Sequence, residues 1–549
     1  MAAEKPALKI PWWGVLAAAF AAELAAHATL LRLPYYWDEA GYYIPAAYDF
    51  FRRGTLIPYS TLSNAHPPVP SLYLALVWTV FHFAPVVTRS AMCLVAALAL
   101  TAVWRLTMVT TGKPAVAAAT VLLTGLYPVV FAQSSLAHAD LFAMAGTLWG
   151  LVFLLEERLG WAAVCFSLAA LAKETAVVTP VALAVWESWR LRPRRRGLRV
   201  TAALLIPVVP LAGWYWYHWH KTGFVFGNPE YLEYNATATL TPLRILLALA
   251  HRVMHVTLHM NLFVPVAAMF ACLLLPPVTE TDGTVRARIA PAHQAVFLVV
   301  IVTNVVLFSV LGGALLTRYL LPLYPLVLLL AVNTFRRRLR EWTGLVALSA
   351  AAFVMGLFVN PPYRFAPEDN LEYATVVRLH QAAIGEIVAH VPHPVVLTAW
   401  PASDELTKPE LGYVTKPVPV VSIDNFSAQA VEKAAYLAQD YNTALVFSTK
   451  YDPPHLLLSL GRKNEKLDER YFDFHRDLPP GLIARALGGS LVWREESKGQ
   501  WAAVLGFKRQ PGATEGKLGR GRFPGESALA GWTHLAEGLN NYFVFNYAE

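Results

Sequence analysis

Residues 35–66, YYWDEAGYYIPAAYDFFRRGTLIPYSTLSNAH, directly follow the first long apolar run of the chain and contain an adjacent pair of acids, Asp38 and Glu39. Burying two carboxylates in lipid without partners costs several kcal/mol. We therefore expect them in a polar cavity at the membrane edge, where a carboxylate can act as a base or as a metal ligand. A polar loop between two helices explains the acid pair equally well, so the rest of the chain must distinguish the two interpretations.

The composition is that of a polytopic membrane protein. Of the 549 residues, 56% are hydrophobic and only 15% are charged, whereas a soluble protein has about 25% charged residues. The net charge of +8 comes largely from short basic clusters between apolar runs. Such clusters are typical of cytoplasmic loops and do not form a nucleic-acid-binding face. The three cysteines all lie inside apolar segments, which excludes a disulfide framework: Cys93, Cys165 and Cys272.

The apolar segments that are long enough to matter for a membrane fall at roughly 12–31, 67–83, 88–109, 114–132, 139–155, 159–172, 174–189, 200–218, 259–276, 292–312, 318–333 and 341–359. The segment at 67–83 begins with a proline pair and is rich in aromatic residues, so we expect it to lie in the membrane interface. If the others cross, the arginine clusters at 190–199 and 335–340 fall inside, as the positive-inside rule requires. Asp38, Lys173, Arg318 and the C-terminal region then fall outside.

This topology depends on the two short apolar segments that flank Lys173. If they formed one kinked helix, everything after them would be inverted. The sequence therefore predicts a polytopic α-helical membrane protein with about 11 to 13 transmembrane helices. The predicted transmembrane domain is 1–359, with its first outer loop at 32–87.

From residue 360 the pattern changes to short strands and helices. Alternating or apolar runs at 394–400, 418–423 and 444–449 read as strands, 428–439 as a helix and 487–509 as a hairpin. Strands separated by helical stretches predict an α/β domain at 360–509, outside the cytoplasm in the topology above. We assign no role to the tail at 510–549.

Four charged features converge on the outer face in this topology. They are the Asp38-Glu39 pair, Asp140 at the outer end of a helix, Lys173-Glu174 within an apolar region, and Arg318 at the outer end of another helix. Each cation alone is explained by a side chain that reaches for the interface. Together they form a candidate site, since the cations could hold a phosphate and one acid could deprotonate an acceptor.

At this level the sequence resembles a family. The ordered motifs are DE at 38–39, HPP at 66–68, RSA at 89–91, YP at 127–128 with HAD at 138–140, AKE at 172–174 and RYLLPLYP at 318–325. This order resembles the C-type membrane glycosyltransferases, in particular the bacterial relatives of protein O-mannosyltransferases and aminoarabinose lipid A transferases. The resemblance covers roughly residues 10–335. Each motif is short, and the ordered set is what is specific.

The resemblance implies an enzyme of the bacterial inner (plasma) membrane that transfers a sugar from a polyprenyl-phosphate-linked donor on the non-cytoplasmic side. It implies Asp38 as the catalytic base, and His66, Lys173 and Arg318 near the donor phosphate. Glu39 and Asp140 are then supporting residues or ligands of a divalent metal. Membrane lipids are the other expected partners, and the acceptor could be a lipid, a glycan or a protein. The chain has His66 where the aminoarabinose branch has Glu-Lys, which argues against an aminoarabinose donor.

Several alternatives stay open. A transporter or flippase for a lipid-linked sugar is the main rival function, although the charged residues cluster at one face and no paired half is visible. A membrane anchor for an active C-terminal domain is the second. His251, His255 and His259 form either a metal site or a polar helix face. The run at 214–220, WYWYHWH, reads as an interfacial aromatic belt, and 400–414 as a structural turn or an acceptor-recognition loop.

Overall fold

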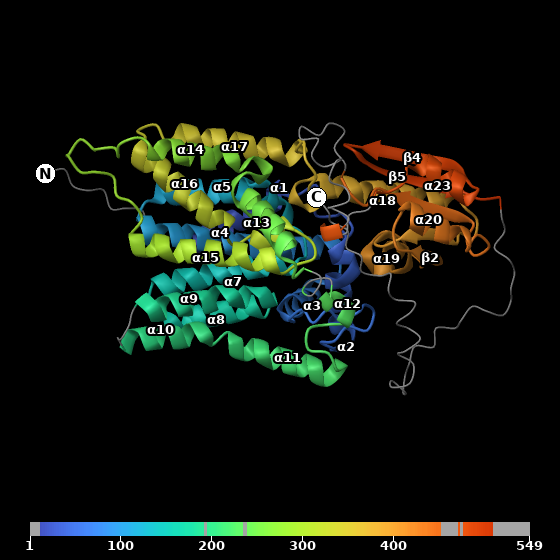
Figure 1. Cartoon of the computed structure of the whole chain (residues 1–549), viewed down its shortest axis with the longest axis horizontal. Helices are drawn as coiled ribbons and strands as arrows, with labels where there is room; N and C mark the ends of the chain where they lie inside the picture. The colour runs from blue at the N-terminus through green and yellow to red at the C-terminus, as the bar shows by residue number, and fades with distance from the viewer. Residues whose placement is uncertain are drawn as a thin grey trace.

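A helical bundle and a sheet domain follow one another along the long axis of the molecule (Figure 1). The computed structural model describes residues 11–190, 195–233, 236, 239–451, 470–472 and 476–508, so the predicted tail at 510–549 lies outside the described residues. The longer helices of the bundle are α1 (Trp12–Ala26), α4 (Pro85–Thr111), α5 (Pro114–Leu126), α7 (Ala139–Leu155), α8 (Leu159–Ala170), α9 (Val178–Arg190), α10 (Arg195–Leu205), α11 (Val208–Thr222), α13 (Pro242–Thr257), α14 (Phe263–Leu273), α15 (Pro291–Val310), α16 (Tyr324–Arg338) and α17 (Thr343–Phe358).

Short helices connect the long ones, and α2, α3 and α12 lie at the end of the bundle next to the sheet domain (Figure 1). These short elements are η1 (Glu39–Tyr43), α2 (Ile44–Arg53), α3 (Val69–Phe81), α6 (Pro128–Gln133), η2 (Glu174–Val177), α12 (Pro229–Leu232), η4 (His259–Asn261), η5 (Thr317–Leu320) and η6 (Pro367–Asp369). Proline often begins a helix here and left-handed glycine ends it: α4 starts at Pro85 and is followed by Gly112 at φ +62°. Both preferences follow from backbone geometry.

Three of the described helical stretches are long and apolar enough to cross a membrane: Pro85–Thr111, Gly197–Thr222 and Pro291–Val310. A fourth is reached if α13 and α14, which are bent by 100° at their junction, count as one span. Shorter apolar helices fill the rest of the bundle. The fold is therefore polytopic and helical, and the number of crossings stays a prediction.

The apolar segments that flank Lys173 form two separate helices, α8 and α9, as the predicted topology requires. The predicted interfacial segment forms α3, which buries Leu74 and Trp78 against the bundle and leaves Leu76 and Val80 exposed. A helix that is apolar on both its buried and its exposed face is typical of a membrane-embedded helix, so the interfacial position of α3 stays a prediction.

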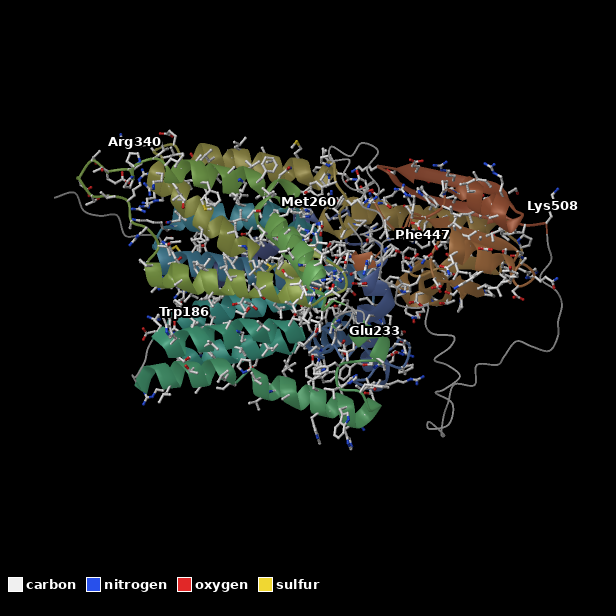
Figure 2. All side chains as sticks on the ribbon, in the orientation of Figure 1. Trp186, Glu233, Met260, Arg340, Phe447 and Lys508 are labelled. Carbon is white, nitrogen blue, oxygen red and sulfur yellow. The ribbon has the colours of Figure 1, made fainter. Side chains whose placement is uncertain are left out.

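Clustered arginines lie at the end of the bundle away from the sheet domain. Arg340 lies at the end farthest from the sheet domain, whereas Phe447 and Lys508 lie in the sheet domain (Figure 2). The basic last turn of α16, Arg336–Arg338, is at the same far end. The arrangement matches the predicted separation of arginine clusters from the outer face.

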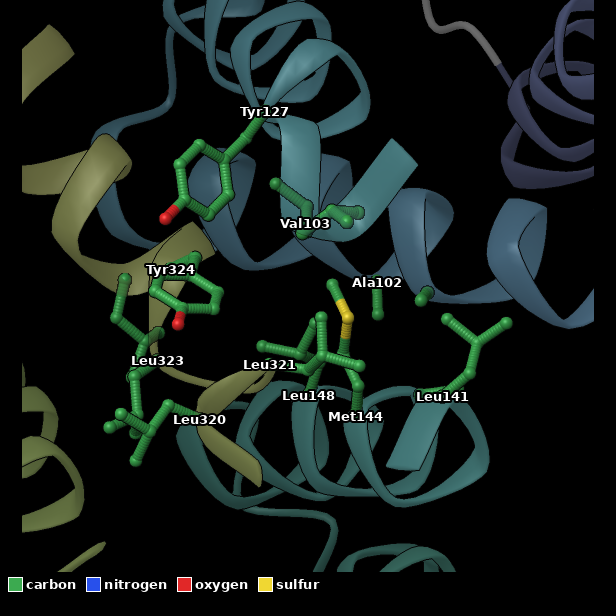
Figure 3. Close-up of a cluster of buried hydrophobic side chains, with 14 of the residues drawn as sticks. Ala102, Val103, Tyr127, Leu141, Met144, Leu148, Leu320, Leu321, Leu323 and Tyr324 are labelled. Atoms are coloured by element: carbon green, nitrogen blue, oxygen red, sulfur yellow. The ribbon is translucent and has the colours of Figure 1, made fainter. Parts of the chain in front are cut away.

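Small residues let the helices of the bundle approach closely. Met144 and Leu148 of α7 lie opposite Ala102 of α4 and beside Leu321, which follows η5 (Figure 3). A Cβ on Gly150 of α7 would come within 2.7 Å of the ring of a residue on α8. Close van der Waals packing of this kind is what holds helices together in lipid.

One predicted segment differs from the structure. The apolar run at 259–276 corresponds to the shorter α14, and α13 precedes it with three buried basic residues, Arg244, Arg252 and His255. The basic side chains lower the apparent hydropathy of α13, because hydropathy takes no account of hydrogen-bond partners that the fold supplies.

The C-terminal domain contains one mixed sheet of order β2-β1-β3-β5-β4. The strands are β1 (Val396–Ala399), β2 (Val420–Ile423), β3 (Thr443–Phe447), β4 (Ser490–Ser497) and β5 (Gln500–Gly506), with α18 (Glu372–His390), α19 (Ala402–Thr407), η7 (Pro409–Leu411), α20 (Ala428–Ala435) and α23 (Pro480–Leu487) around them. β1 pairs in parallel with β2 and β3, and the β4–β5 hairpin is antiparallel. The predicted strands, helix and hairpin all form here.

Candidate active site

A cavity of about 460 Å³ lies at the end of the bundle that carries α2 and α3. One part of its lining is polar and comes from four separate segments of the chain: Asp38, Tyr42, Tyr43, His66, Lys173, Glu174, Arg318 and Tyr319. The other part is apolar: Val177, Val178, Leu211, Phe226, Leu307, Phe308 and Leu311. One cavity therefore has an ionic part and an apolar part.

Arg318 sits at the centre of the ionic part. Its Nη2 donates to Asp38 and its Nη1 donates to Glu368 Oε2 at 2.6 Å, while its Nε lies 3.4 Å from Asp140 Oδ2. The side chain is 3% exposed. One planar guanidinium thus holds three carboxylates from different elements, which its fork of donors allows and a lysine does not.

Lys173 is the second cation and lies in the turn between α8 and α9. Its Nζ donates to Asp140 and lies 3.7 Å from the centre of the Tyr319 ring. Asp140 occupies the first turn of α7, where the helix dipole favours a negative charge. Asp140 therefore links the two cations and fixes their spacing, and it is not among the side chains that line the cavity.

Asp38 lines the cavity and has one carboxylate oxygen without a hydrogen-bond partner among the described residues. Its Oδ2 accepts from Arg318, whereas its buried Oδ1 accepts no hydrogen bond from any residue in the described ranges. The residue before it, Trp37, has φ +42°. Such backbone strain for a bulky residue costs of order 1–3 kcal/mol and is typical of sites where the position of a side chain matters.

His66 lies at the other side of the polar lining. Its Nδ1 is 3.0 Å from Glu174 Oε2, and its ring stacks on Tyr43 at a centroid distance of 5.7 Å. The preceding Ala65 has φ +58°, and its carbonyl accepts from Trp214 Nε1 at 2.8 Å. The fold thus presents His66 to the cavity by bracing a strained turn.

The aromatic run at 214–220 is divided by its helix. Trp214 and His218 are buried, and His218 Nε2 lies 2.7 Å from the hydroxyl of Ser63. Trp216 and Trp219 are 64% and 51% exposed. The predicted membrane belt therefore describes one face of α11, and the other face supports the turn that carries His66.

Glu39 does not line the cavity. Its carboxylate accepts from Ala137 N at 2.7 Å, from Tyr36 N at 2.8 Å and from Arg89 Nη2 at 3.2 Å. Neighbouring residues on a helical turn point about 100° apart, so Asp38 and its neighbour Glu39 serve different surroundings. Glu39 anchors the backbone beneath the site.

The acids suggested as ligands of a divalent metal both have partners within the fold. Glu39 is held by three donors, and Asp140 is engaged by Lys173 and Arg318. In the described part of the chain, no group of three or more His, Cys, Asp and Glu side chains could hold a metal ion. Of the histidine row on α13 and η4, His259 pairs with Asp369 at 3.0 Å, so this row is also engaged within the fold.

The acids of η6 were not predicted from the sequence. Glu368 holds Arg318, and the next residue, Asp369, accepts from the hydroxyl of Thr317 and pairs with His259. Two consecutive acids, Glu368 and Asp369, therefore bind two consecutive residues of η5, Arg318 and Thr317. In the sequence they look like ordinary loop acids after the last apolar segment, and only their complete burial reveals them.

The C-terminal domain packs directly on the segment that carries Asp38. The ring of Trp400 lies beside Trp37 at a centroid distance of 5.2 Å, and the hydroxyl of Tyr413 donates to the carbonyl of Tyr35 at 3.0 Å. An added Cβ on Gly41 would come within 2.5 Å of the Trp400 ring. The stretch 400–414 thus forms the floor against which the 35–41 segment is held.

Replacing Gly41 with alanine is expected to reduce activity of the site. The new methyl group must displace Trp400 or shift η1, at a cost of about 1–3 kcal/mol. Activity assays and thermal unfolding of Gly41→Ala, alone and with Trp400→Leu, measure this effect, and the second change should restore much of the loss. Gly385→Ala on α18 is the control, because no atom lies within 4 Å of the added Cβ. Equal behaviour of the two alanine variants would contradict the packing argument.

Comparison with solved structures supports the fold. ArnT from Cupriavidus metallidurans bound to undecaprenyl phosphate is similar with a TM-score of 0.53 and 15% sequence identity, over 89% of this chain and 98% of that chain. The apo structure of the same ArnT gives a TM-score of 0.51 at 15% identity, over 90% and 98%. No protein-family model matches the chain, and no curated protein sequence does. The chain therefore has the fold of these two ArnT structures, a polytopic helical bundle with a C-terminal sheet domain, which is the fold that the ordered motifs led us to expect.

Proposed function

We propose that the protein is an integral-membrane glycosyltransferase that moves a hexosyl or pentosyl group from a polyprenyl-phosphate-linked donor to an acceptor at the outer face of the membrane. The observation that carries the proposal is the cavity itself. Asp38, with a free carboxylate oxygen, shares its polar lining with Lys173 and Arg318, and the same space continues into an apolar channel. A polyprenyl phosphate needs cations around its phosphate group and an apolar surface along its lipid chain.

The geometry supports a direct displacement. Asp38 Oδ1 takes the proton of an acceptor hydroxyl, the acceptor oxygen bonds to the anomeric carbon, and the bond from that carbon to the phosphate oxygen breaks. The donor is a phosphodiester, so the leaving polyprenyl phosphate gains a second negative charge as Asp38 loses its own. Lys173 and Arg318 would stabilise this developing charge, which is the largest contribution available in a site of low dielectric.

Arg318 has a further part in this scheme. It pairs with Asp38, and a bound phosphate would compete for the same guanidinium. Entry of the donor would then free Asp38 to act on the acceptor. His66, which pairs with Glu174 within the cavity lining, would complete the contacts to the phosphate or the sugar. No step needs a metal.

The orientation follows from the charge distribution. Arg336–Arg338 and Arg340 lie at the end of the bundle farthest from the sheet domain, so the positive-inside rule favours an orientation with the cavity and the C-terminal domain outside the cytoplasm of a bacterial inner membrane. The acceptor, whether lipid, glycan or protein, would approach from that side. The match of the ArnT fold, with one structure bound to undecaprenyl phosphate, is consistent with the donor class.

The test is transfer in proteoliposomes that contain purified protein, a defined polyprenyl-phosphate sugar and an extract of candidate acceptors. We expect release of polyprenyl phosphate together with a glycosylated acceptor, both detected by mass spectrometry. Movement of the intact lipid-linked sugar between leaflets without cleavage would instead establish a flippase. If the protein neither cleaves nor binds the donor, the proposal is refuted.

The buried Glu368 gives the site a dependence on pH. Burial raises the pKa of Glu368 from 4.5 to about 8; Arg318 opposes the shift, and the nearby Asp38, Asp369 and Asp140 add to it. The folded protein therefore binds a proton that the unfolded chain releases, so the contribution of Glu368 to the unfolding free energy falls as pH rises from about 4.5 to about 8.

Glu368→Gln mimics the protonated carboxyl and should remove this dependence. Thermal unfolding in detergent across the same pH range measures it: the midpoint of the wild type should fall relative to that of the variant as pH rises. A difference that stays constant with pH would mean that Glu368 does not titrate in this window.

A further inference from the structure

The part of the cavity wall between α15 and η5 has no regular secondary structure, and side chains from another segment of the chain bind its backbone. Residues 308–316, here called the wall segment, include Phe308, Leu311, Gly312 and Leu316 of the cavity lining and lead directly to Arg318. Gly312 has φ +104°, so the backbone leaves the helical path at this point. The last carbonyls of a helix and of such a turn need donors from elsewhere.

Side chains from residues 239–252 supply those donors. Arg252 donates from Nε to Phe308 O at 3.1 Å and from Nη1 to Leu316 O at 2.8 Å. Arg244 donates from Nη2 to the carbonyls of Gly312 and Gly313 at 2.7 and 3.0 Å. The hydroxyl of Thr239 donates to Val310 O at 2.8 Å. Five carbonyls of the wall segment are thus capped by three side chains.

The two arginines have different geometrical roles. Arg252 bridges Phe308 and Leu316, which are eight positions apart, and so closes the wall segment into a loop. Leu316 is two residues before Arg318, hence this bridge fixes the point from which Arg318 enters the site. Arg244 holds Gly312 and Gly313, which lie farther from Arg318 along the chain. Both guanidinium groups belong to residues that are almost completely buried, at 0% and 2% exposure.

α13 also contacts the C-terminal region. The guanidinium of Arg244 lies 5.4 Å from the centre of the Phe472 ring, and His251 meets the same ring edge-on at 5.8 Å. The helix that braces the wall segment is therefore itself in contact with the C-terminal region. A displacement of α13 would be transmitted to the cavity through these hydrogen bonds.

From these contacts we propose that Arg252 and Arg244 are positioning residues of the donor site: Arg252 sets the place of Arg318, and Arg244 sets the wall against which the lipid lies. The inference rests on the proposed function for the identity of the ligand. The bland alternative is that both arginines only satisfy buried carbonyls and stabilise the fold. A third reading is that their positive charge, and not their geometry, attracts the phosphate.

Substitutions separate these readings. Arg252→Lys keeps the charge but cannot span two carbonyls, and Arg252→Gln removes both. Arg286→Gln is the matched control, since Arg286 donates to the carbonyls of Arg336 and Leu339 at the end of α16, away from the cavity. The measurements are thermal unfolding, binding of polyprenyl phosphate by native mass spectrometry, and kcat and KM for sugar transfer.

We expect both Arg252 variants to lower kcat by about tenfold or more, the scale of one lost charged hydrogen bond, and Arg244→Gln to raise the donor KM with a smaller effect on kcat. Arg286→Gln should lose comparable stability and keep kcat and KM. Wild-type kinetics in Arg252→Lys with loss in Arg252→Gln would establish the charge reading, and equal kinetic losses in Arg286→Gln would establish the purely structural one; either result overturns the inference. If the wild type does not bind polyprenyl phosphate, the proposed function fails first.

Discussion

Replacing Asp38 with asparagine is expected to lower sugar transfer by about 10²–10⁴-fold, the usual contribution of a general base. Asparagine has nearly the same shape but cannot take a proton from the acceptor hydroxyl. Binding of polyprenyl phosphate should persist, because Lys173 and Arg318 remain and Arg318 loses a competing carboxylate. Transfer assays and lipid binding on the same preparation measure both quantities.

The control for this variant is Asp282→Asn, which alters an exposed acid in the loop between α14 and α15. It should leave transfer unchanged. Wild-type transfer by correctly inserted Asp38→Asn protein would exclude Asp38 as the base. Loss of lipid binding together with transfer would mean that Asp38 shapes the donor site and does not act on the acceptor.

Replacing Arg318 with glutamine is expected to have the largest effect on stability. It leaves Asp38, Glu368 and Asp140 without their shared cation. Removing one partner of a buried ion pair costs about 3–5 kcal/mol. Thermal unfolding in detergent measures the loss, and some of it will be offset by proton uptake on the carboxylates.

Arg318→Lys separates stability from chemistry. A lysine keeps one positive charge but cannot contact three carboxylates and a phosphate at once, so we expect a folded protein with strongly reduced transfer. Arg105→Gln is the control: Arg105 is 49% exposed and pairs with Glu156, and exposed pairs contribute about 0–1 kcal/mol. Similar stability losses in the Arg318 and Arg105 variants would contradict the central place of Arg318.

The overall architecture could be predicted because hydropathy and charge report directly on the membrane. Basic clusters such as Arg336–Arg338 mark one end of the bundle, and the alternation after residue 390 marks strands. The prediction that Asp38, Lys173 and Arg318 lie on one face followed from the alternating direction of successive helices together with the positive-inside rule. The alternation of helix direction does not depend on the details of packing, so errors in individual helix boundaries do not change it.

The rest of the site depends on tertiary partners that no local pattern encodes. Arg252 and Arg244 look like residues of an exposed amphipathic helix until the carbonyls of the wall segment are placed beside them. Glu368 and Asp369 look like loop acids. Glu39 shares its sequence environment with Asp38, and only the turn of η1 directs it to Arg89 and away from the cavity.

The role of 400–414 is a similar case. The sequence left open a structural turn or a recognition loop, and the structure places Trp400 and Tyr413 against the 35–41 segment. The contact is therefore structural support for the site.

The most direct measurement is a structure of the protein in lipid with bound polyprenyl phosphate. We expect the phosphate about 3 Å from Lys173 Nζ and the Arg318 guanidinium, with the prenyl chain along Leu307, Phe308 and Leu311 and with Asp38 released from Arg318. A phosphate bound at the opposite end of the bundle, near Arg336–Arg338, would contradict the assignment of this cavity as the donor site.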